Sequence, residues 1–550
     1  MKSIFQYIGI LIITGGFLLS GCEEFLDRNP LDEVSEATFW KTEDDARLAL
    51  NGVYERDGEW RDAYEIAHGD CWSDNGLQAK ADVRDPIVGT DFTPSTGMVA
   101  GHWNGSYDQI AKCNTFLENI DKVDMDEDLK NEYIAEVRFF RAWEYFNLTQ
   151  WFEDVPLVKK VLTMDEANSV TVTPKSEIVE FVLNELDAVI PELPATRPDN
   201  EHGRILRGAA YAVKGRLLMS EERWSEAATA YKNLMDMNVH SIDEDYRSLF
   251  DGSNEQSSEI IFVSKYLKAE VTHNLQLTVR PNLDGGWHHS NPSKDLVDSY
   301  LCANGETIEE NATYQNADDF KGEFVNDQGE WYRDPRLYYT IYLPDVHVLQ
   351  GGLVYQGHPD STQSGDQVGE DVGTTGYGLR KWVDENYEGD IWNSGNDAPI
   401  IRYAEVLLSY LESKIKAGDP ISQDLLDNTI NQIRTRESVD MPPVNRSDYG
   451  SAMDLWNNCV KRERRIELAY EGKRLWDLVR WGEDGTLTDK VVYGIKLTEN
   501  PETYEGEFSI DDEGYARIFT MKYQDHYHPW PIPQDELDIN SNLEQKDNWK

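Results

Sequence analysis

The stretch Leu206–Met237, LRGAAYAVKGRLLMSEERWSEAATAYKNLMDM, decides the fold. Its first half places apolar residues at Ala210, Val213 and Leu217, and its second half repeats apolar residues at helical intervals from Trp224 onward. Spacings of three and four residues put side chains on one face of a helix. The stretch therefore predicts two helices joined by a short turn.

Small residues allow the two predicted helices to approach each other closely. Gly215 lies in the first helix, and Ala227 and Ala228 lie in the second. With Trp224 at the turn and Tyr231 beyond it, they follow the landmarks of a tetratricopeptide repeat, which recurs about every 34 residues. One such hairpin cannot bury its own apolar face, so we expect other hairpins to stack on it.

Similar patterns occur on both sides of this hairpin. We expect a second hairpin over Ile401–Ile433 and a third helical piece over Asn458–Trp481. Earlier helices are predicted from Ser35 to Tyr54, over Trp103–Ile120, over Asn131–Phe152 and over Ile178–Ile190. The helix over 131–152 has apolar residues on two sides and is therefore buried on two sides. We expect its Arg138 and Arg141 to contact carboxylates rather than water.

Between these helical parts the composition changes. Glu259–Tyr266 is a short β-type run, and Gly, Asp, Asn, Pro and aromatic residues replace helical patterns until about Pro399. The predicted fold is mostly α, with tetratricopeptide-like helical hairpins, a loop-rich insertion and few short strands. We divide the chain into a signal peptide (1–21), a tether (22–36), an N-terminal helical part (37–264), a ligand-face insertion (265–398) and a C-terminal helical part that completes the same domain (399–550).

The N-terminus resembles a lipoprotein export signal. Lys2 precedes the apolar run Ile8–Leu19, which is too short for a good membrane span. Leu19-Ser20-Gly21-Cys22 resembles a bacterial lipobox, in which the cysteine is lipidated and becomes the mature N-terminus. Acyl chains add about 0.8 kcal/mol per buried methylene, so a lipid on Cys22 would anchor the protein to a membrane. An ordinary secretory signal that happens to end in cysteine is the alternative.

The charge of the chain excludes some classes of partner. Asp and Glu number 102 against 52 Lys and Arg, which gives a net charge of −50. Nucleic acids need a basic surface, and anionic lipids repel an acidic one. Hydrophobic residues at 39% and aromatic residues at 11% indicate a folded protein. We therefore expect no nucleic-acid partner and ligands of low charge.

The cysteines after Cys22 are widely spaced and form no metal or redox motif. An exported protein permits disulfides, but the sequence does not pair these cysteines, and we expect buried free thiols. The four residues are Cys71, Cys113, Cys302 and Cys459.

Several stretches together resemble one known family. They are the lipobox with Phe25–Pro30; Ala37–Trp40 with Asn51–Tyr54; Ala135–Ala142; Arg402–Leu408 with Ile430–Arg434; Glu463–Gly472 with Asp477-Leu478 and Arg480-Trp481; and Ile532–Leu537 with Asn540 and Asn542-Leu543. On these motifs the chain resembles the SusD/RagB outer-membrane lipoproteins of glycan- and peptide-uptake systems. The resemblance spans nearly the whole sequence.

The resemblance implies a fold of tetratricopeptide-like helical pairs that supports a loop-rich ligand face. Members of the family act without catalysis, and no cofactor is implied. They form a lid on a SusC-like TonB-dependent transporter and capture oligosaccharides or, in some cases, peptides. We therefore expect a lipid-anchored protein of the outer membrane that faces the cell exterior.

A row of carboxylates needs an explanation of its own. Glu463, Glu467 and Glu471 lie four residues apart on one helical face, where like charges repel. We expect an interhelical ion network, with paired-carboxylate catalysis as the alternative. The cations expected in this network are Arg138, Arg141 or Arg434.

Metal and catalytic motifs are absent from the sequence. His288-His289 and His526-x-His528 are the only histidine clusters, and neither has the ligand spacing of a zinc site. Asp511–Gly514 is acidic but lacks the spacing of an EF-hand, so we expect a solvated turn there. The sequence leaves open whether the protein binds calcium. The sequence holds no His-Glu-x-x-His, Gly-x-Ser-x-Gly or P-loop motif.

Aromatic residues in the irregular regions are the candidates for ligand binding. Neutral sugars present flat C–H faces and a rim of hydroxyls, so a binder needs exposed rings beside polar side chains. For each loop tryptophan, the alternative to ligand binding is a role in packing. Trp103, Trp143 and Trp481 lie in predicted helices and are assigned to the core. The predicted ligand-binding residues are Trp72, Asp74, Asn75 and Arg84 in the first irregular region, and Trp287, His288 and Trp331 in the second.

These observations favour a non-enzymatic, cell-surface glycan-binding lipoprotein that delivers oligosaccharide to a partner transporter. The same scaffold binding peptides is the first alternative. A glycoside hydrolase that uses two loop carboxylates is the second. A tetratricopeptide adaptor for other proteins is the third, and the large aromatic insertion argues against it.

Overall fold

The computed structural model describes residues 39–55, 59–78, 85–89, 92–315, 321–326, 328–361, 365–369, 374–497 and 509–550. The predicted signal peptide, the predicted lipidation site Cys22 and the candidate ligand residue Arg84 lie outside the described residues.

The predicted helical hairpin is present. It consists of α9 (Arg207–Ser220) and α10 (Trp224–Asp236), which pack against each other. A Cβ atom added to Gly215 would lie 2.4 Å from Cζ of Tyr231 in α10. Since real side chains do not approach so closely, the absence of a side chain at Gly215 sets the separation of the two helices.

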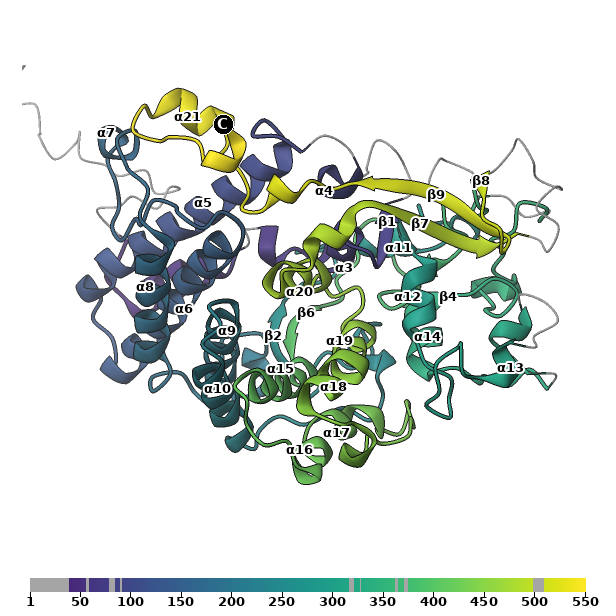
Figure 1. The fold of residues 1–550 in the computed structure, drawn as a ribbon. Coiled ribbons are helices and arrows are strands. Elements are labelled where there is room, and N and C mark those ends of the chain that lie inside the picture. The colour runs from purple at the N-terminus through teal and green to yellow at the C-terminus, as the bar shows by residue number, and fades with distance from the viewer. Residues whose placement is uncertain are drawn as a thin grey trace, which may run out of the picture.

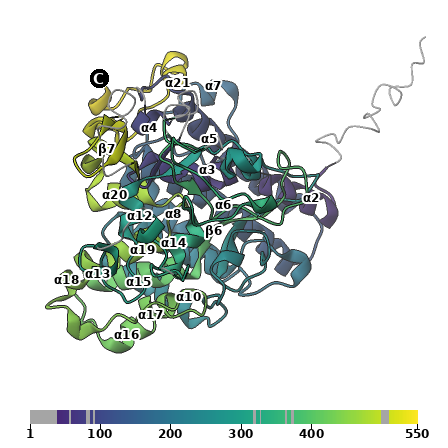
Figure 2. The same ribbon diagram turned by 90° about the vertical axis from the view of Figure 1, so that its right-hand side faces the viewer.

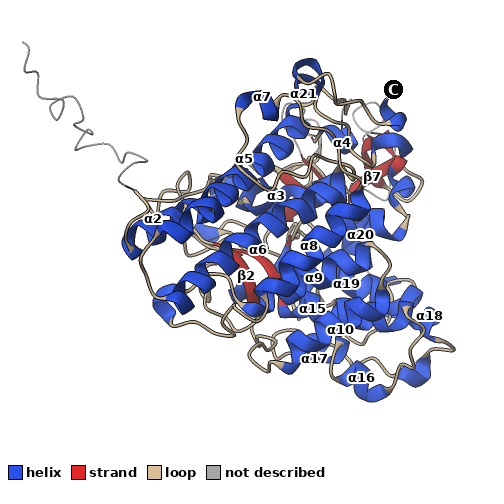
Figure 3. Cartoon of the chain, turned by 90° about the vertical axis from the view of Figure 1, so that its left-hand side faces the viewer, coloured by secondary structure: helices blue, strands red, loops and turns tan. Residues whose placement is uncertain are grey.

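Further helices stack on this hairpin as expected. In the N-terminal part, α6 (Glu127–Trp151) and α8 (Lys175–Val189) contact α9. This part also contains α2 (Glu43–Tyr54) and α5 (Gly97–Asn119), which pack against α6, and the short α3 (Ala63–His68), α4 (Pro86–Gly89) and α7 (Met164–Ala167). Figure 3 shows α8, α9, α10 and α15 (Tyr403–Lys416) packed in sequence. Both predicted arginines of α6 bind a carboxylate of α8: Arg138 and Arg141 contact Glu185 at 2.8 and 2.7 Å.

The second predicted hairpin is only partly regular. Its first helix is α15, but its second half is split into α16 (Gln423–Asp427) and α17 (Ile430–Arg434). At the break, the hydroxyl of Thr429 donates to the carbonyl of Leu425 at 2.6 Å, and the backbone of Thr429 leaves the helical region. Such local side-chain bonds compete with the helix, which explains the interruption.

The third predicted helix, over 458–481, is also interrupted. A π-helical turn over Trp456–Val460 follows α18 (Ala452–Leu455), and then α19 (Lys461–Glu467) ends before α20 (Arg474–Trp481) begins. The carboxylate of Asp70 accepts hydrogen bonds from the backbone N–H groups of Tyr470 and Lys473 at 2.6 and 3.1 Å. A residue 400 positions away in the chain therefore stabilises the break.

The predicted ion network exists, but other cations form most of it. Arg434 binds Glu463 at 2.6 Å as expected, whereas Arg138 and Arg141 are bound to Glu185 instead. The remaining cations of the network are Arg336, Arg402, Arg436 and Lys381. Because the three glutamates of the row are buried and bound to cations, the network belongs to the framework.

Arg402 is the centre of this network. Its Nη1 lies 2.7 Å from carboxylate oxygens of both Glu259 and Glu467, and its Nε lies 2.8 Å from Glu471. Burial alone would raise the pKa of Glu471, but Arg402 and Lys381 lower it below its usual range. The network thereby joins β6 (Ala398–Arg402), which contains Arg402, to α19 and the segment after it.

The strands are short and all pair antiparallel. β2 (Ile260–Ser264), predicted as part of the run 259–266, pairs with β6 (Ala398–Arg402). The other pairs are β1 (Gly76–Gln78) with β3 (Ser290–Pro292), β4 (Ile341–Tyr342) with β5 (Gly378–Leu379), and β9 (Tyr515–Lys522) with both β7 (Thr488–Lys496) and β8 (Ser509–Ile510). The short helices α11 (Leu275–Val279), α12 (Lys294–Ser299), α13 (Ala312–Gln315) and α14 (Pro335–Thr340) lie among these strands.

The arrangement confirms the predicted fold class, which is mostly helical with few short strands (Figure 1). In Figure 1 the N-terminal helices lie on the left and α12, α13 and α14 lie on the right, a side that Figure 2 turns toward the viewer. The last α-helix of the described residues, α21 (Gln534–Ile539), lies beside α7, and Asn540 Nδ2 after it donates to the carbonyl of Val170 at 2.8 Å.

Two further expectations concern the cysteines and the membrane. Cys71, Cys113, Cys302 and Cys459 are buried and form no disulfide with one another, in agreement with the expectation of free thiols. Among the helices of the described residues, none combines the length and the apolar character that a bilayer crossing requires.

Candidate functional site

The two irregular regions with predicted ligand residues come together in space. β1 follows Trp72–Asn75 directly, and it pairs with β3, which follows His288 and His289. Residues about 215 positions apart are thereby neighbours, since Gln78 lies opposite Ser290. The strand pair, however, is buried, and it carries several of the candidate residues into the interior.

Asp74 is a framework residue in this arrangement. Its carboxylate binds Arg474 at 2.7 Å and Arg465 at 3.3 Å, and only 5% of the residue is exposed. Burial alone would raise the pKa of Asp74, but the two arginines lower it well below its usual range. The carboxylate is therefore ionised and fully engaged.

Asn75 and His288 are also in the interior. Asn75 donates to Asp70 at 2.8 Å and accepts from Nε of Arg465 at 2.8 Å. Nδ1 of His288 lies 2.7 Å from the carboxylate of Asp366, and His288 is fully buried. The expectation that Asp74, Asn75 and His288 lie on an exposed ligand face is wrong, because charged and polar partners distant in the sequence hold them inside.

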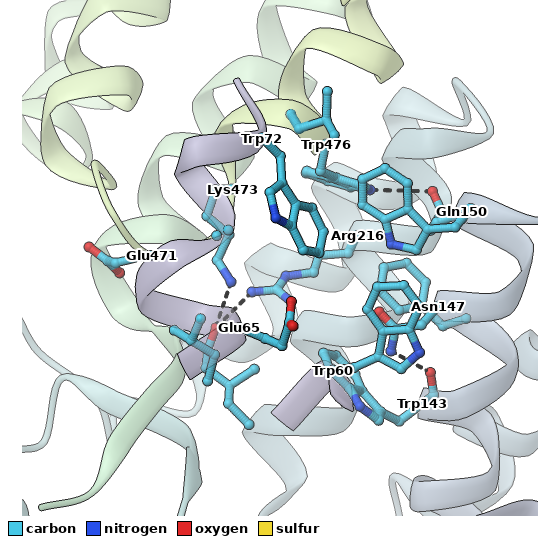
Figure 4. A pocket seen from close by; sticks show the side chains of 17 residues that line it. Trp60, Glu65, Trp72, Trp143, Asn147, Gln150, Arg216, Glu471, Lys473 and Trp476 are labelled. Carbon is cyan, nitrogen blue, oxygen red and sulfur yellow. Dashed lines mark hydrogen bonds between the residues drawn. The ribbon is translucent and has the colours of Figure 1, made fainter. Parts of the chain in front are cut away.

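Trp72 is 7% exposed and lines a small cavity of about 90 Å³ (Figure 4). Lys473 Nζ and Arg216 Nη2 both donate to the carbonyl of Ile400 at the cavity wall, at 2.9 and 3.0 Å. Burial lowers the pKa of Lys473 to about 8. The other tryptophans that line this cavity are Trp60, Trp143, Trp151 and Trp476.

The size of this cavity limits what it can hold. This volume has room for several water molecules. Pockets that bind larger organic ligands measure roughly 300–1,000 Å³. The cavity is therefore too small for an oligosaccharide, and Trp72 acts as a wall residue of the interior.

The exposed candidate surface is formed by four segments, 267–271, 280–287, 346–355 and 384–394, which we call the loop face. Side-chain contacts join them. Lys268 Nζ lies 5.2 Å above the ring of Tyr387, and Arg280 Nη1 donates to Gln350 at 3.5 Å. Arg280 Nη2 also donates to the carbonyl of Asp384.

Two indole rings meet on the loop face. The ring centroids of Trp287 and Trp392 are 5.0 Å apart, and the ring planes are perpendicular at 89°. Trp392 is 55% exposed and Trp287 is half-buried. His289 lies behind Trp287 with a centroid distance of 5.3 Å. This edge-to-face pair presents aromatic surface to solvent, as a sugar-binding platform requires.

Trp392 is held by its own loop. The carboxylate of Asp390 accepts hydrogen bonds from the backbone N–H of Trp392 at 3.1 Å and from Asn393 Nδ2 at 2.8 Å. The amide of Asn393 and the backbone of Trp392 lower the pKa of Asp390 below its usual range. Trp392 is not among the ligand-binding residues predicted from the sequence; its position in a run of Gly, Asp, Asn and Ser within the predicted insertion is the signal that could have identified it.

Exposed apolar side chains are concentrated on the loop face. Six of the thirteen exposed large hydrophobic side chains of the described residues lie on the loop face: Leu267, Val271, Val348, Leu353, Val354 and Trp392. Such a concentration is typical of an interaction surface. Glu270 and Val271 also line a cleft of about 730 Å³. That volume lies within the range of ligand pockets.

Trp331 forms a separate aromatic surface. Its ring stacks on Tyr338 with centroids 4.2 Å apart and planes 1° from parallel, and 42% of Trp331 is exposed. Of the predicted ligand residues described here, Trp287 and Trp331 therefore have accessible rings. Their role in ligand binding stays a prediction.

Comparisons with known proteins agree on one family. A family model described as the SusD family matches residues 258–549, and a second, described as starch-binding associating with outer membrane, matches residues 24–219. A SusD-like carbohydrate-binding protein from Bacteroides fragilis has a similar crystal structure, with a TM-score of 0.84 and 32% sequence identity. The match covers 92% of this chain and 100% of that one.

Two other relatives are less similar. Another SusD-like protein from Bacteroides fragilis has a TM-score of 0.75 and 25% identity, covering 94% of this chain and 99% of its own. SusD-like protein P25 from Formosa agariphila is 23% identical over 520 residues, which are 88% of this chain and 90% of that protein.

Proposed function

This chain belongs to the SusD family, and from that premise we propose that it is a cell-surface lipoprotein that captures oligosaccharides on its loop face. The observation that carries the proposal is the exposed edge-to-face pair of Trp287 and Trp392. Aromatic rings cover the apolar faces of sugars, while nearby polar side chains bond the hydroxyls. The Bacteroides fragilis relative is described as a carbohydrate-binding protein, which supports the same ligand class.

The proposal includes the cellular context. A lipid on Cys22 anchors the protein to the outer membrane, residues 22–36 act as a tether, and a SusC-like TonB-dependent transporter receives the captured oligosaccharide. The matched family description, which mentions association with the outer membrane, supports this location. Replacement of Cys22 by Ala is expected to release the protein from the membrane fraction, and the intact protein is expected to co-purify with the transporter.

Calorimetry with a panel of purified oligosaccharides and peptides tests the ligand class. At least one oligosaccharide is expected to bind the full-length protein. Removal of both rings in Trp287→Ala/Trp392→Ala is expected to weaken that binding at least about tenfold, because exposed aromatic contacts supply much of the affinity. Leu48→Ala, at an exposed site on α2, is the matched control and should bind normally. Binding of peptides alone would replace the proposal with a peptide carrier.

We propose that capture proceeds without catalysis. Each oligosaccharide that binds is incubated with the protein, and the products are separated by chromatography. The starting material is expected to be recovered intact. Turnover that disappears when a loop carboxylate is replaced would identify a glycoside hydrolase instead.

A further inference from the structure

The charges of the loop face are strongly unbalanced. Its four segments contain two cations, Lys268 and Arg280. They contain six carboxylates, which are Glu270, Asp284, Asp384, Glu385, Glu388 and Asp390. The excess of carboxylates over cations therefore lies on the same face of the protein as Trp392.

Two of these carboxylates are neutralised by ion pairs. Asp284 binds Arg280 at 2.8 Å, and Glu385 binds Arg380 at 2.9 Å and Arg247 at 3.1 Å. These pairs join the loops to one another and to the framework. They leave little net charge where they lie.

Four carboxylates of the loop face form no ion pair with the described residues. They are Glu270, Asp384, Glu388 and Asp390, and three of them are exposed whereas Asp384 is half-buried. Among the described residues the carboxylate of Asp390 bonds only to amide groups, and Asp390 lies two residues from Trp392. Since Arg280 is paired with Asp284, Lys268 is the remaining cation of the loop face, and its ammonium group lies over the ring of Tyr387.

We infer that the ligand of the loop face is an uncharged oligosaccharide and that these four carboxylates disfavour sulfated and uronic-acid glycans. This inference rests on the proposed function. Asp390 lies two residues from Trp392, and its carboxylate oxygens can accept hydrogen bonds from the hydroxyls of a neutral sugar on the ring pair. All four carboxylates repel a sulfate or a uronate that approaches the loop face, and this repulsion is poorly screened at separations below the Debye length, which is about 10 Å at 0.1 M salt.

The test compares ligands that differ only in charge. Neutral oligosaccharides and uronate or sulfated oligosaccharides of similar length are titrated into the full-length protein at 20 mM salt. The best neutral binder is then sulfated chemically and titrated again. Its affinity is expected to fall at least about tenfold on sulfation, from repulsion by several unit charges across the face. At 300 mM salt the difference should shrink.

A charge variant isolates the cause. Glu270→Gln/Glu388→Gln is expected to leave the affinity for the neutral ligand within about twofold and to raise the affinity for the sulfated ligand several-fold at low salt. The matched control, Glu43→Gln/Glu127→Gln, removes two exposed glutamates from α2 and α6 and should change neither affinity.

The outcomes separate the inference from the proposed function. An anionic glycan that binds as tightly as any neutral one at low salt would overturn the inference and leave glycan capture intact. No effect of Glu270→Gln/Glu388→Gln on the sulfated ligand would also overturn it. If no oligosaccharide of either kind binds, both the proposed function and the inference fall.

Discussion

Asp390 positions Trp392 through a hydrogen bond of 3.1 Å from the backbone N–H of Trp392 to the carboxylate. A second hydrogen bond, from Asn393 at 2.8 Å, closes the turn. Because these bonds lie within one exposed loop, they order the backbone at Trp392 locally, while the indole ring packs edge-to-face against Trp287. The aromatic pair therefore depends on a local turn that a single substitution can open.

Asp390→Ala should weaken oligosaccharide binding several-fold, because the loop loses both hydrogen bonds and the free protein must order Trp392 on binding. Asp390→Asn retains an acceptor oxygen and should bind a neutral ligand nearly as well as the wild type. Calorimetry measures both variants. Equal binding by Asp390→Ala and the wild type would show that the turn is not needed to position the ring.

The second prediction concerns the close approach of α9 and α10. Gly215→Ala places a methyl group 2.4 Å from Cζ of Tyr231, so the ring or the helix must shift. We expect the free energy of unfolding to fall by about 1–3 kcal/mol, as for other overpacked cores. Urea denaturation measures it.

The matched control for this substitution is Gly52→Ala in α2. No atom lies within 4 Å of the Cβ position at Gly52, apart from its own helix backbone and chain neighbours. Alanine in a helix should therefore raise the free energy of unfolding by about 0.5–1 kcal/mol. Opposite signs for the two variants are the expected outcome, and a stabilising Gly215→Ala would contradict the packing argument.

The success with α9 and α10 shows which features a sequence can reveal. Their apolar spacing is local, and Gly215 faces Tyr231 only 16 positions away. The end of α19 was not predictable in this way, because Asp70 and Lys381 bind the backbone between α19 and α20 from distant parts of the chain. Local patterns predict helices, whereas interruptions made by remote partners require the fold.

The same reason explains the errors at the candidate site. Trp72–Asn75 has the composition of a polar, aromatic ligand loop, but Asp74 binds Arg465 and Arg474, roughly 400 residues later. Nothing local in the sequence indicates that ion pair. Trp287 has an accessible ring in the predicted insertion, and its partner Trp392 is 105 positions away, too far for a pattern to join them.

The third prediction tests the centre of the ion network. Arg402→Met leaves Glu259, Glu467 and Glu471 buried without their shared cation. Removal of one partner from a buried ion network commonly costs about 3–5 kcal/mol, so we expect a large loss in the free energy of unfolding. Chemical denaturation followed by circular dichroism measures the loss.

A surface ion pair is the control for Arg402. Arg47 binds Asp44 at 2.7 Å on α2, where both side chains are largely exposed. Arg47→Met should change stability little, because solvent screens such a pair. If both variants were equally stable, the buried network would not be a structural requirement.

The fourth prediction concerns pH. Arg216 binds Glu405 through two hydrogen bonds of 2.7 Å, and both side chains are buried. Burial alone would raise the pKa of Glu405, but Arg216 and nearby cations lower it to about 2 from its usual value of 4.5. A lowered pKa in the folded state stabilises the protein above pH 4.5, and this contribution is lost as the pH falls toward 2.

Glu405→Gln isolates this contribution. At pH 7 the variant should be less stable than the wild type by roughly 3 kcal/mol, because Arg216 is left buried without its carboxylate. As the pH falls from 4.5 to 2, protonation of Glu405 makes the wild type resemble the variant, so the difference in the free energy of unfolding should shrink. Denaturation curves of both proteins across this range measure the difference. If it stayed constant with pH, the pKa of Glu405 would not be lowered in the folded protein.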